Sequence, residues 1–148
     1  MQLPAFSLAA NDGKVYTDAD ITAGITVLYA YPRDMTPGCT TESQNFRDLN
    51  AEFEALGAKV IGVSKDSVAS HQKFCAKESL PFLLLSDAEG ELLTALGAMK
   101  EKSMYGKTFL GIERSTFVVK DGEIVREWRK VKVPGHAQEV LDYVKTIA

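Results

Sequence analysis

Apolar runs of strand length alternate along this chain with segments in which apolar residues recur at helical spacing. The run at 25–31 is apolar on both faces, which is typical of a strand in the middle of a sheet. Further strands are expected at 59–64, 82–85, 115–119 and 124–131, and helices at 36–56, from Ser67 onward, at 89–96 and at 136–147. The alternation predicts an α/β fold in which helices flank a central mixed sheet.

Turn signals and chain length complete this prediction. The Asn-Asp-Gly turn at residues 11–13, with Leu8 before it and Val15 after it, indicates an N-terminal β-hairpin. The segment from 97 to 112 is expected to be a long loop, and loops of that length are usually functional or mobile. With 148 residues and no low-complexity linker, the chain is expected to form one domain, residues 1–148.

The charge and hydropathy of the chain argue against two classes of partner. The net charge of −3 provides no overall basic field, which disfavours nucleic-acid binding. A basic stretch at 126–132 alternates with apolar residues and is expected to be the solvated face of an exposed strand. The N-terminus does not resemble a secretion signal, and no apolar run reaches membrane-spanning length. We therefore expect a cytoplasmic protein without membrane contact.

Cys39 is the residue whose position most strongly suggests chemistry. In a reducing compartment, Cys39 and Cys75 are more typical of transient catalytic disulfides than of permanent ones. The Thr-Pro-Gly helix start at 36–38 places Cys39 in a first helical turn, where unpaired N–H groups and the helix dipole stabilise a thiolate. A buried, inert cysteine is the alternative, but such a residue has no need of a first turn. The pattern therefore favours a reactive thiol.

The segment around Cys39 resembles the active site of a known family. Pro32-x-x-x-Thr36-x-x-Cys39 is similar to the signature of peroxiredoxins, and its Thr-Pro-Gly-Cys-Thr-Thr-Glu form resembles the peroxiredoxin Q subgroup, also called bacterioferritin comigratory protein. Segments similar to the same subgroup occur in order along nearly the whole chain, at 63–67, 86–87, 101–107, 111–117 and 131–136. The resemblance implies a thioredoxin-like fold and a thiol-dependent peroxidase that reduces hydrogen peroxide or organic hydroperoxides.

The resemblance also implies roles for individual residues. Cys39 is the expected peroxidatic cysteine, Thr36 the hydroxyl that orients the peroxide, and Pro32 the ring that shields the sulfur from water. Arg114 matches the arginine that stabilises the thiolate and the breaking O–O bond, and a guanidinium is a permanent charge with several donors in a fixed fork. Glu42 either orients Arg114 or is an acidic residue of the kind favoured near a helix N-terminus.

By the same resemblance, Cys75 is the expected resolving cysteine, which forms an intramolecular disulfide with Cys39. Many members of the subgroup place this cysteine five residues after the peroxidatic one, where this chain has Gln44, but others carry it on the next helix. The alternative is a core residue, because Cys75 lies seven residues after Val68 and so on the same helical face. Because cysteines on separate packed helices seldom come within disulfide range, we expect one or both helices to unravel on oxidation.

No metal, cofactor or phosphate-binding loop is expected. His71 and His136 lack metal-ligand spacing with either cysteine, and we expect them on a helix surface and at a helix start. The resemblance implies a monomer whose disulfide is reduced by thioredoxin or a similar dithiol. A disulfide reductase is disfavoured because residues 36–39 contain one cysteine rather than two. A peroxide sensor or thiol-switched binding protein without sustained turnover is the alternative function.

Overall fold

A seven-stranded mixed sheet forms the centre of the molecule. The computed structural model describes all residues from Met1 to Ala148. The strands lie in the order β2-β1-β5-β4-β3-β8-β9. Their bounds are β1 (Ser7–Ala10), β2 (Val15–Thr17), β3 (Ile25–Ala30), β4 (Ala58–Ser64), β5 (Leu83–Ser86), β8 (Ser115–Lys120) and β9 (Glu123–Trp128). β3 is parallel to β4 and antiparallel to β8, and all of its residues are buried, which confirms the expected central strand.

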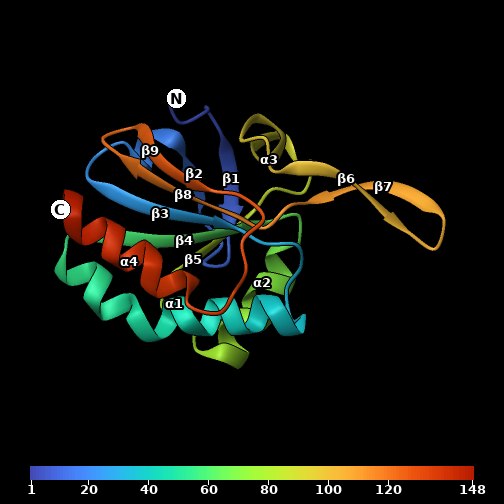
Figure 1. The fold of residues 1–148 in the computed structure, drawn as a ribbon, viewed down its shortest axis with the longest axis horizontal. Helices are drawn as coiled ribbons and strands as arrows, with labels where there is room; N and C mark the ends of the chain where they lie inside the picture. Colours follow the sequence, from blue (N-terminus) through green and yellow to red (C-terminus); the bar gives the residue numbers. More distant parts are fainter.

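Helices cover both faces of this sheet, as Figure 1 shows. They are η1 (Asp18–Ile21), α1 (Pro37–Ala55), α2 (Val68–Glu78), α3 (Glu91–Ala95) and α4 (His136–Ile147). One core lies between the sheet and α1, α2 and α4, and it includes Phe46, Phe74 and Val140. The other lies on the opposite face under α3 and η1, and it includes Leu93 and Ile21. No helix is both long enough and apolar enough to cross a membrane.

The first helix and the N-terminal hairpin begin and end close to the residues that the sequence predicts. α1 starts at Pro37 with Thr36 as its N-cap. Gly57 follows α1 with a φ of +74°, a left-handed conformation that costs glycine little. The expected N-terminal hairpin forms between β1 and β2, which pair antiparallel. The short connection of residues 31–36 thus leads from the buried β3 to the N-terminus of α1.

The basic stretch at 126–132 does not lie on one exposed strand, contrary to the sequence prediction. β9 ends at Trp128, so only Arg126 lies on the strand, and it is exposed. Arg129 instead turns back over the sheet: its guanidinium lies 5.0 Å from the centre of the Phe117 ring and donates to Gly97 O at 2.9 Å. A cation stacked on an aromatic ring is stabilised there, so Arg129, which is half-buried, contributes to packing.

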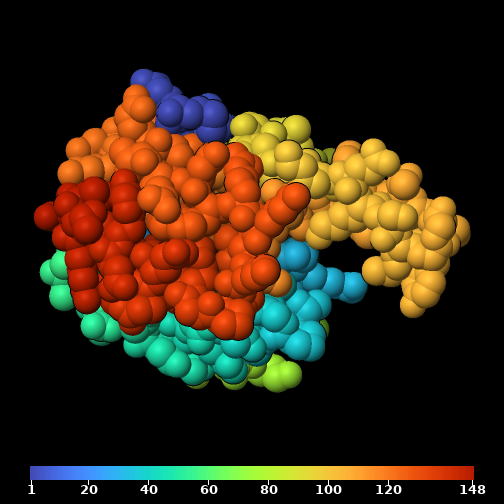
Figure 2. All heavy atoms as spheres, viewed as in Figure 1, coloured from blue at the N-terminus to red at the C-terminus, as the bar shows by residue number.

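The prediction of a long loop at 97–112 is wrong, because most of this segment forms a second, two-stranded sheet. β6 (Met99–Met104) pairs antiparallel with β7 (Lys107–Ile112). Tyr105 and Gly106 join them, both with positive φ, which is the backbone of a tight hairpin turn. Figure 2 shows this hairpin as an arm that projects from the body of the molecule. Tyr105 at its tip is 97% exposed.

Candidate active site

Cys39 lies at the N-terminus of α1 with its sulfur out of solvent. It is the third residue of the helix and 1% exposed. It contributes to the core cluster that also contains Tyr31, at the end of β3. The first N–H groups of a helix have no partners within the helix and form the positive end of its dipole. The fold therefore sets the Cys39 sulfur where a negative charge is favoured, as the sequence predicts.

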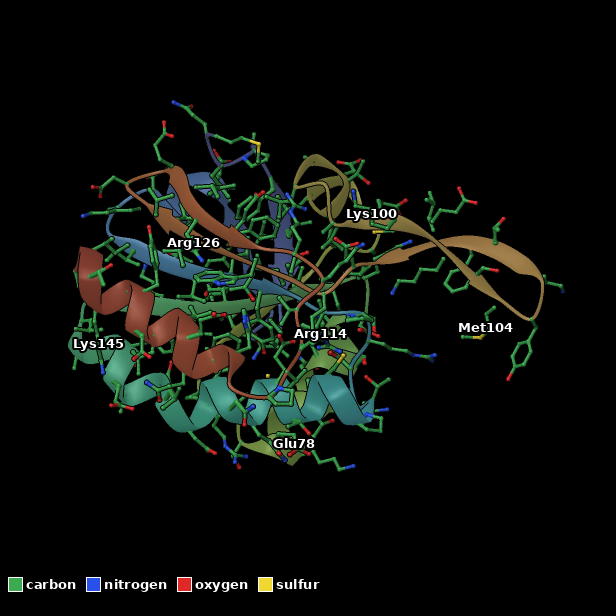
Figure 3. The ribbon with its side chains drawn as sticks, in the orientation of Figure 1. Glu78, Lys100, Met104, Arg114, Arg126 and Lys145 are labelled. Atoms are coloured by element: carbon green, nitrogen blue, oxygen red, sulfur yellow. The ribbon has the colours of Figure 1, made fainter.

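Arg114 brings a positive charge to this sulfur from a distant part of the chain. It lies directly before β8, and its Nη2 donates to Cys39 Sγ at 3.4 Å. A Cβ at Gly38 would lie 3.2 Å from Arg114 Nη2, so the glycine leaves room for the guanidinium. Burial lowers the pKa of Arg114, but Glu42 and Cys39 outweigh burial and raise it. Arg114, labelled in Figure 3, is thus a permanent cation beside the thiol.

Glu42 completes this group from one turn further along α1. Its Oε1 accepts from Arg114 Nη1 at 2.6 Å, and its side chain is 1% exposed. Burial raises the pKa of Glu42 to about 7, although Arg114 opposes the shift. Its second oxygen, Oε2, is buried without a hydrogen-bond partner. Of the two interpretations of Glu42, the contact with Arg114 is the one present in the structure.

Thr36 and Pro32 lie on the connection between β3 and α1. Thr36 is the N-cap residue, but its Oγ1 donates to Arg33 O at 2.9 Å and makes no capping bond to α1. That hydroxyl hydrogen is therefore engaged, and the oxygen lone pairs can accept a hydrogen bond from another molecule. Pro32 is the second residue after β3 and is partly exposed. Both residues therefore lie on the connection that leads into the first turn of α1, which carries Cys39.

Cys75 occupies a different setting, in the second half of α2. It is partly buried, packs against the same core cluster as Cys39, and is a free thiol, as is Cys39. Its Sγ accepts from Asn11 Nδ2 at 3.3 Å. Burial, assisted by the carboxylate of Asp34, raises the pKa of the Cys75 thiol to about 11. In this conformation Cys75 is a protonated and weakly nucleophilic thiol.

Comparison with known proteins identifies the family and the fold. The model of a family described as the AhpC/TSA family matches residues 1–128. The chain belongs to this family. Peroxiredoxin Bcp of Bacillus subtilis is 47% identical over 146 residues, which cover 98% of this chain and 93% of the relative. Peroxiredoxin Bcp of Xanthomonas campestris is 54% identical over 123 residues, which cover 82% of this chain and 77% of the relative.

Solved structures agree with this assignment. A structure of Xanthomonas campestris peroxiredoxin Q superposes with a TM-score of 0.90 and 50% identity, covering 95% of this chain and 90% of the other. The peroxidoxin BcpB of Mycobacterium tuberculosis gives a TM-score of 0.88 at 30% identity, covering 100% and 96% of the two chains. The chain therefore has the thioredoxin-like fold of peroxiredoxins and is a thiol-dependent peroxidase, which confirms the family and the fold that the sequence resemblance implied.

The two histidines of this peroxiredoxin lie at buried positions. His136 begins α4 as expected, and its Nε2 lies 2.8 Å from Thr116 Oγ1. Burial lowers the pKa of His136. The expected surface position of His71 is wrong, because its side chain is 0% exposed and lies on the buried face of α2. The helical spacing around His71 did not reveal this, because a buried polar partner cannot be read from periodicity.

That partner is Asp34, from the connection between β3 and α1. His71 Nδ1 lies 2.7 Å from Asp34 Oδ2. Together with Asp66 the two could in principle hold a metal ion, since one ligand atom of each lies within 4.8 Å of the others. Their oxygens, however, already accept hydrogen bonds from the hydroxyls of Tyr31, Ser64 and Ser70. The cluster is therefore a hydrogen-bonded structural network rather than an open ligand set.

Proposed function

We propose that this peroxiredoxin reduces hydrogen peroxide and organic hydroperoxides at Cys39, in a cycle completed by Cys75 and an external dithiol. The observation that carries the proposal is the contact of Arg114 Nη2 with Cys39 Sγ at 3.4 Å. A thiolate is the nucleophile in such chemistry, and a fixed cation beside it stabilises both that form and the charge that develops on oxygen. The related Xanthomonas protein is described as having alkyl peroxide reduction activity, which supports organic substrates.

The first step is the attack of the Cys39 thiolate on the terminal oxygen of the hydroperoxide. The S–O bond forms, the O–O bond breaks, and the sulfur loses two electrons to the peroxide. Arg114 stabilises the departing oxygen, which leaves as water or an alcohol after protonation. Thr36 Oγ1, whose hydrogen is directed to Arg33 O, accepts from the peroxide O–H and orients it. Pro32 limits the access of water to the sulfur.

In the second step, Cys75 attacks the sulfur of the Cys39 sulfenic acid. The S–S bond forms, the S–O bond breaks, and the hydroxyl leaves as water with the proton of the Cys75 thiol. Two solved structures of the Xanthomonas peroxiredoxin Q are cysteine-to-serine variants at positions whose separation equals that of Cys39 and Cys75, which supports this pairing. Since both cysteines lie in intact helices, the step requires local unfolding of α1, α2 or both.

The third step returns the enzyme to its dithiol form. Thioredoxin or a similar dithiol attacks the Cys39–Cys75 disulfide, passes through a mixed disulfide and leaves oxidised. We place the cycle in a monomer of one domain in the cytoplasm, where dithiol reductants are available. No metal or organic cofactor is required, because the two sulfur atoms carry all the electrons that are exchanged.

Turnover of peroxide with thioredoxin, thioredoxin reductase and NADPH tests the proposal. We expect sustained turnover by the native protein and no turnover by Cys39→Ser. The variant Cys75→Ser should consume about one equivalent of peroxide per chain and then stop, unless a small thiol such as dithiothreitol is added. Sustained turnover by Cys39→Ser would contradict the assignment of the nucleophile. If the native protein itself stops after one equivalent, the alternative function as a peroxide sensor is supported instead.

A further inference from the structure

A buried proton-sharing pair, His71 and Asp34, joins the segments that carry the two cysteines. His71 Nε2 lies 3.0 Å from Leu85 O, and because a carbonyl only accepts, that nitrogen carries a hydrogen. His71 Nδ1 lies 2.7 Å from Asp34 Oδ2, so a single proton lies between these two atoms. Asp34 is 5% exposed and His71 0%. The pair is thus almost fully removed from water, where hydrogen bonds between ionisable groups are strong.

Further hydrogen bonds extend this pair into a network that joins several segments of the fold. Asp34 Oδ1 accepts from Tyr31 OH at 2.5 Å, and Asp34 Oδ2 also accepts from Ser70 Oγ at 2.8 Å. The backbone N–H of Asp34 donates to Asp66 Oδ2 at 2.9 Å. The network therefore ties the end of β3 and the approach to α1 to α2, to β5 and to the loop after β4.

The position of the pair relative to the two thiols gives it a consequence for the reaction. Asp34 lies five residues before Cys39, on the connection that leads into α1, and His71 lies one helical turn before Cys75. In an α-helix the N–H of residue i bonds to the carbonyl of residue i−4, so the turn that holds Cys75 is built on His71. Whether the start of α1 or the turn of Cys75 unfolds, the Asp34–His71 contact resists the movement.

We propose that Asp34 and His71 form a latch that keeps Cys75 in its folded helix, and that opening of this latch sets the rate at which the Cys39–Cys75 disulfide forms. The proposal rests on the resolution by Cys75 described above. Both residues act as positioning residues, since neither contacts a reacting atom. Opening of the latch allows the Cys75 sulfur to reach Cys39. Until it opens, the Cys39 sulfenic acid can react with a second peroxide, which oxidises it further to the sulfinic acid.

Rapid mixing of the reduced, full-length protein with hydrogen peroxide tests the latch. The reaction is quenched at intervals with acid and a thiol-blocking reagent, and intact mass resolves the thiol, sulfenic, disulfide and sulfinic forms. In His71→Gln, we expect disulfide formation to be about tenfold faster, because the variant loses the buried hydrogen bond to Asp34 and local opening becomes more favourable. The loss of the Cys39 thiol should keep its native rate, and the sulfinic product at high peroxide should fall.

Two further variants make this result specific. Asp34→Asn lets an amide donate to His71 Nδ1, so it keeps a hydrogen bond but not the charge, and we expect a smaller acceleration of about threefold. Gln72→Ala is the matched control, because Gln72 adjoins His71 on α2 but makes only an exposed bond to Asn11 O, at 3.1 Å. It should form the disulfide at the native rate.

Unchanged or slower disulfide formation in both latch variants would overturn the proposal, as would an equal change in the rate of Cys39 oxidation. Hydrogen exchange separates a failure of the latch from a failure of the proposed function. If the native protein forms no Cys39–Cys75 disulfide, resolution by Cys75 is wrong, yet the latch still requires the amides of α2 and of residues 34–40 to exchange faster in His71→Gln than in Gln72→Ala. Equal exchange in these two variants would refute the latch by itself.

Discussion

The two cysteines of this peroxiredoxin share one chemical group and one apolar core, but they differ in the polar groups that surround the sulfur. Cys39 sits at the positive end of α1 and accepts a hydrogen bond from a guanidinium, 3.4 Å away. Cys75 sits in the second half of α2, where its sulfur accepts a hydrogen bond from the amide of Asn11 and the carboxylate of Asp34 helps to raise its pKa. Burial alone therefore does not make a thiol unreactive: at Cys39 the helix N-terminus and a cation oppose its effect, whereas at Cys75 burial raises the pKa and the carboxylate of Asp34 adds to the rise.

Removal of the guanidinium is the strongest way to make the Cys39 site resemble the Cys75 site. For Arg114→Ala we expect the second-order rate constant for Cys39 oxidation by peroxide to fall about 100-fold or more, since a lost donor at a developing oxyanion costs that much. Stopped-flow measurement of thiol loss tests this. The control is Arg126→Ala, which removes an exposed arginine from β9 and should leave the rate unchanged. A fall of less than threefold in Arg114→Ala would contradict the role of Arg114.

Alkylation measures the suppressed reactivity of Cys75 directly. The rise of its pKa from the ordinary 9.0 to about 11 lowers the thiolate fraction at neutral pH about 100-fold, and the thiolate is the reactive form. In the single-cysteine variant Cys39→Ser, iodoacetamide should therefore modify folded Cys75 about 100-fold more slowly than Cys75 of the same protein in urea. Equal rates in the two states would show that α2 does not protect this thiol.

The smallest expected effect concerns the carboxyl that holds the guanidinium beside Cys39. The pKa of Glu42 is raised in the folded protein from its ordinary 4.5 to about 7, so between these values the folded state binds more protons than the unfolded state. Stability is then fully present below about pH 4.5 and falls as the pH rises towards 7. We expect the free energy of unfolding to decrease by about 2 kcal/mol from this group between pH 5 and pH 7.

Urea denaturation of Glu42→Gln over this pH range tests the assignment. The amide cannot ionise, so the pH dependence that Glu42 contributes should disappear. Glu52→Gln is the matched control, because Glu52 lies on the same helix with an exposed side chain, and it should keep the native pH profile. A native profile in Glu42→Gln would mean that Glu42 ionises normally in the folded protein.

The sequence predicted best those features that depend on local patterns. The central strand, the start of α1 and the whole of α4 follow from apolar spacing and capping residues, and so does the position of Cys39 in a first turn. The contact of Arg114 with Cys39 spans 75 residues of sequence, and only the family resemblance indicated it. Long-range pairs of this kind depend on the register of the sheet, which no local pattern specifies.

Two predictions failed for related reasons. The sequence predicts a loop at the hairpin of β6 and β7 because β6 is highly charged and both strands are mostly exposed, so neither shows the apolar alternation of a strand packed on a core. The sequence predicts a surface position for His71 because a histidine among polar neighbours has no periodic signal of burial. In both cases the structure depends on a pairing that the local sequence does not specify. β6 pairs with β7, and His71 pairs with Asp34.

The β6–β7 hairpin has one further consequence, for protein engineering. Its two ends meet where the backbone N–H of Glu113 donates to Ala98 O at 2.7 Å, so the chain leaves the body and returns to it at nearly the same point. A reporter domain or affinity tag inserted at the Tyr105–Gly106 tip would therefore lie away from the central sheet. A short turn in place of the whole hairpin would still connect Ala98 to Glu113. This tip offers a handle for immobilising the catalyst on a surface.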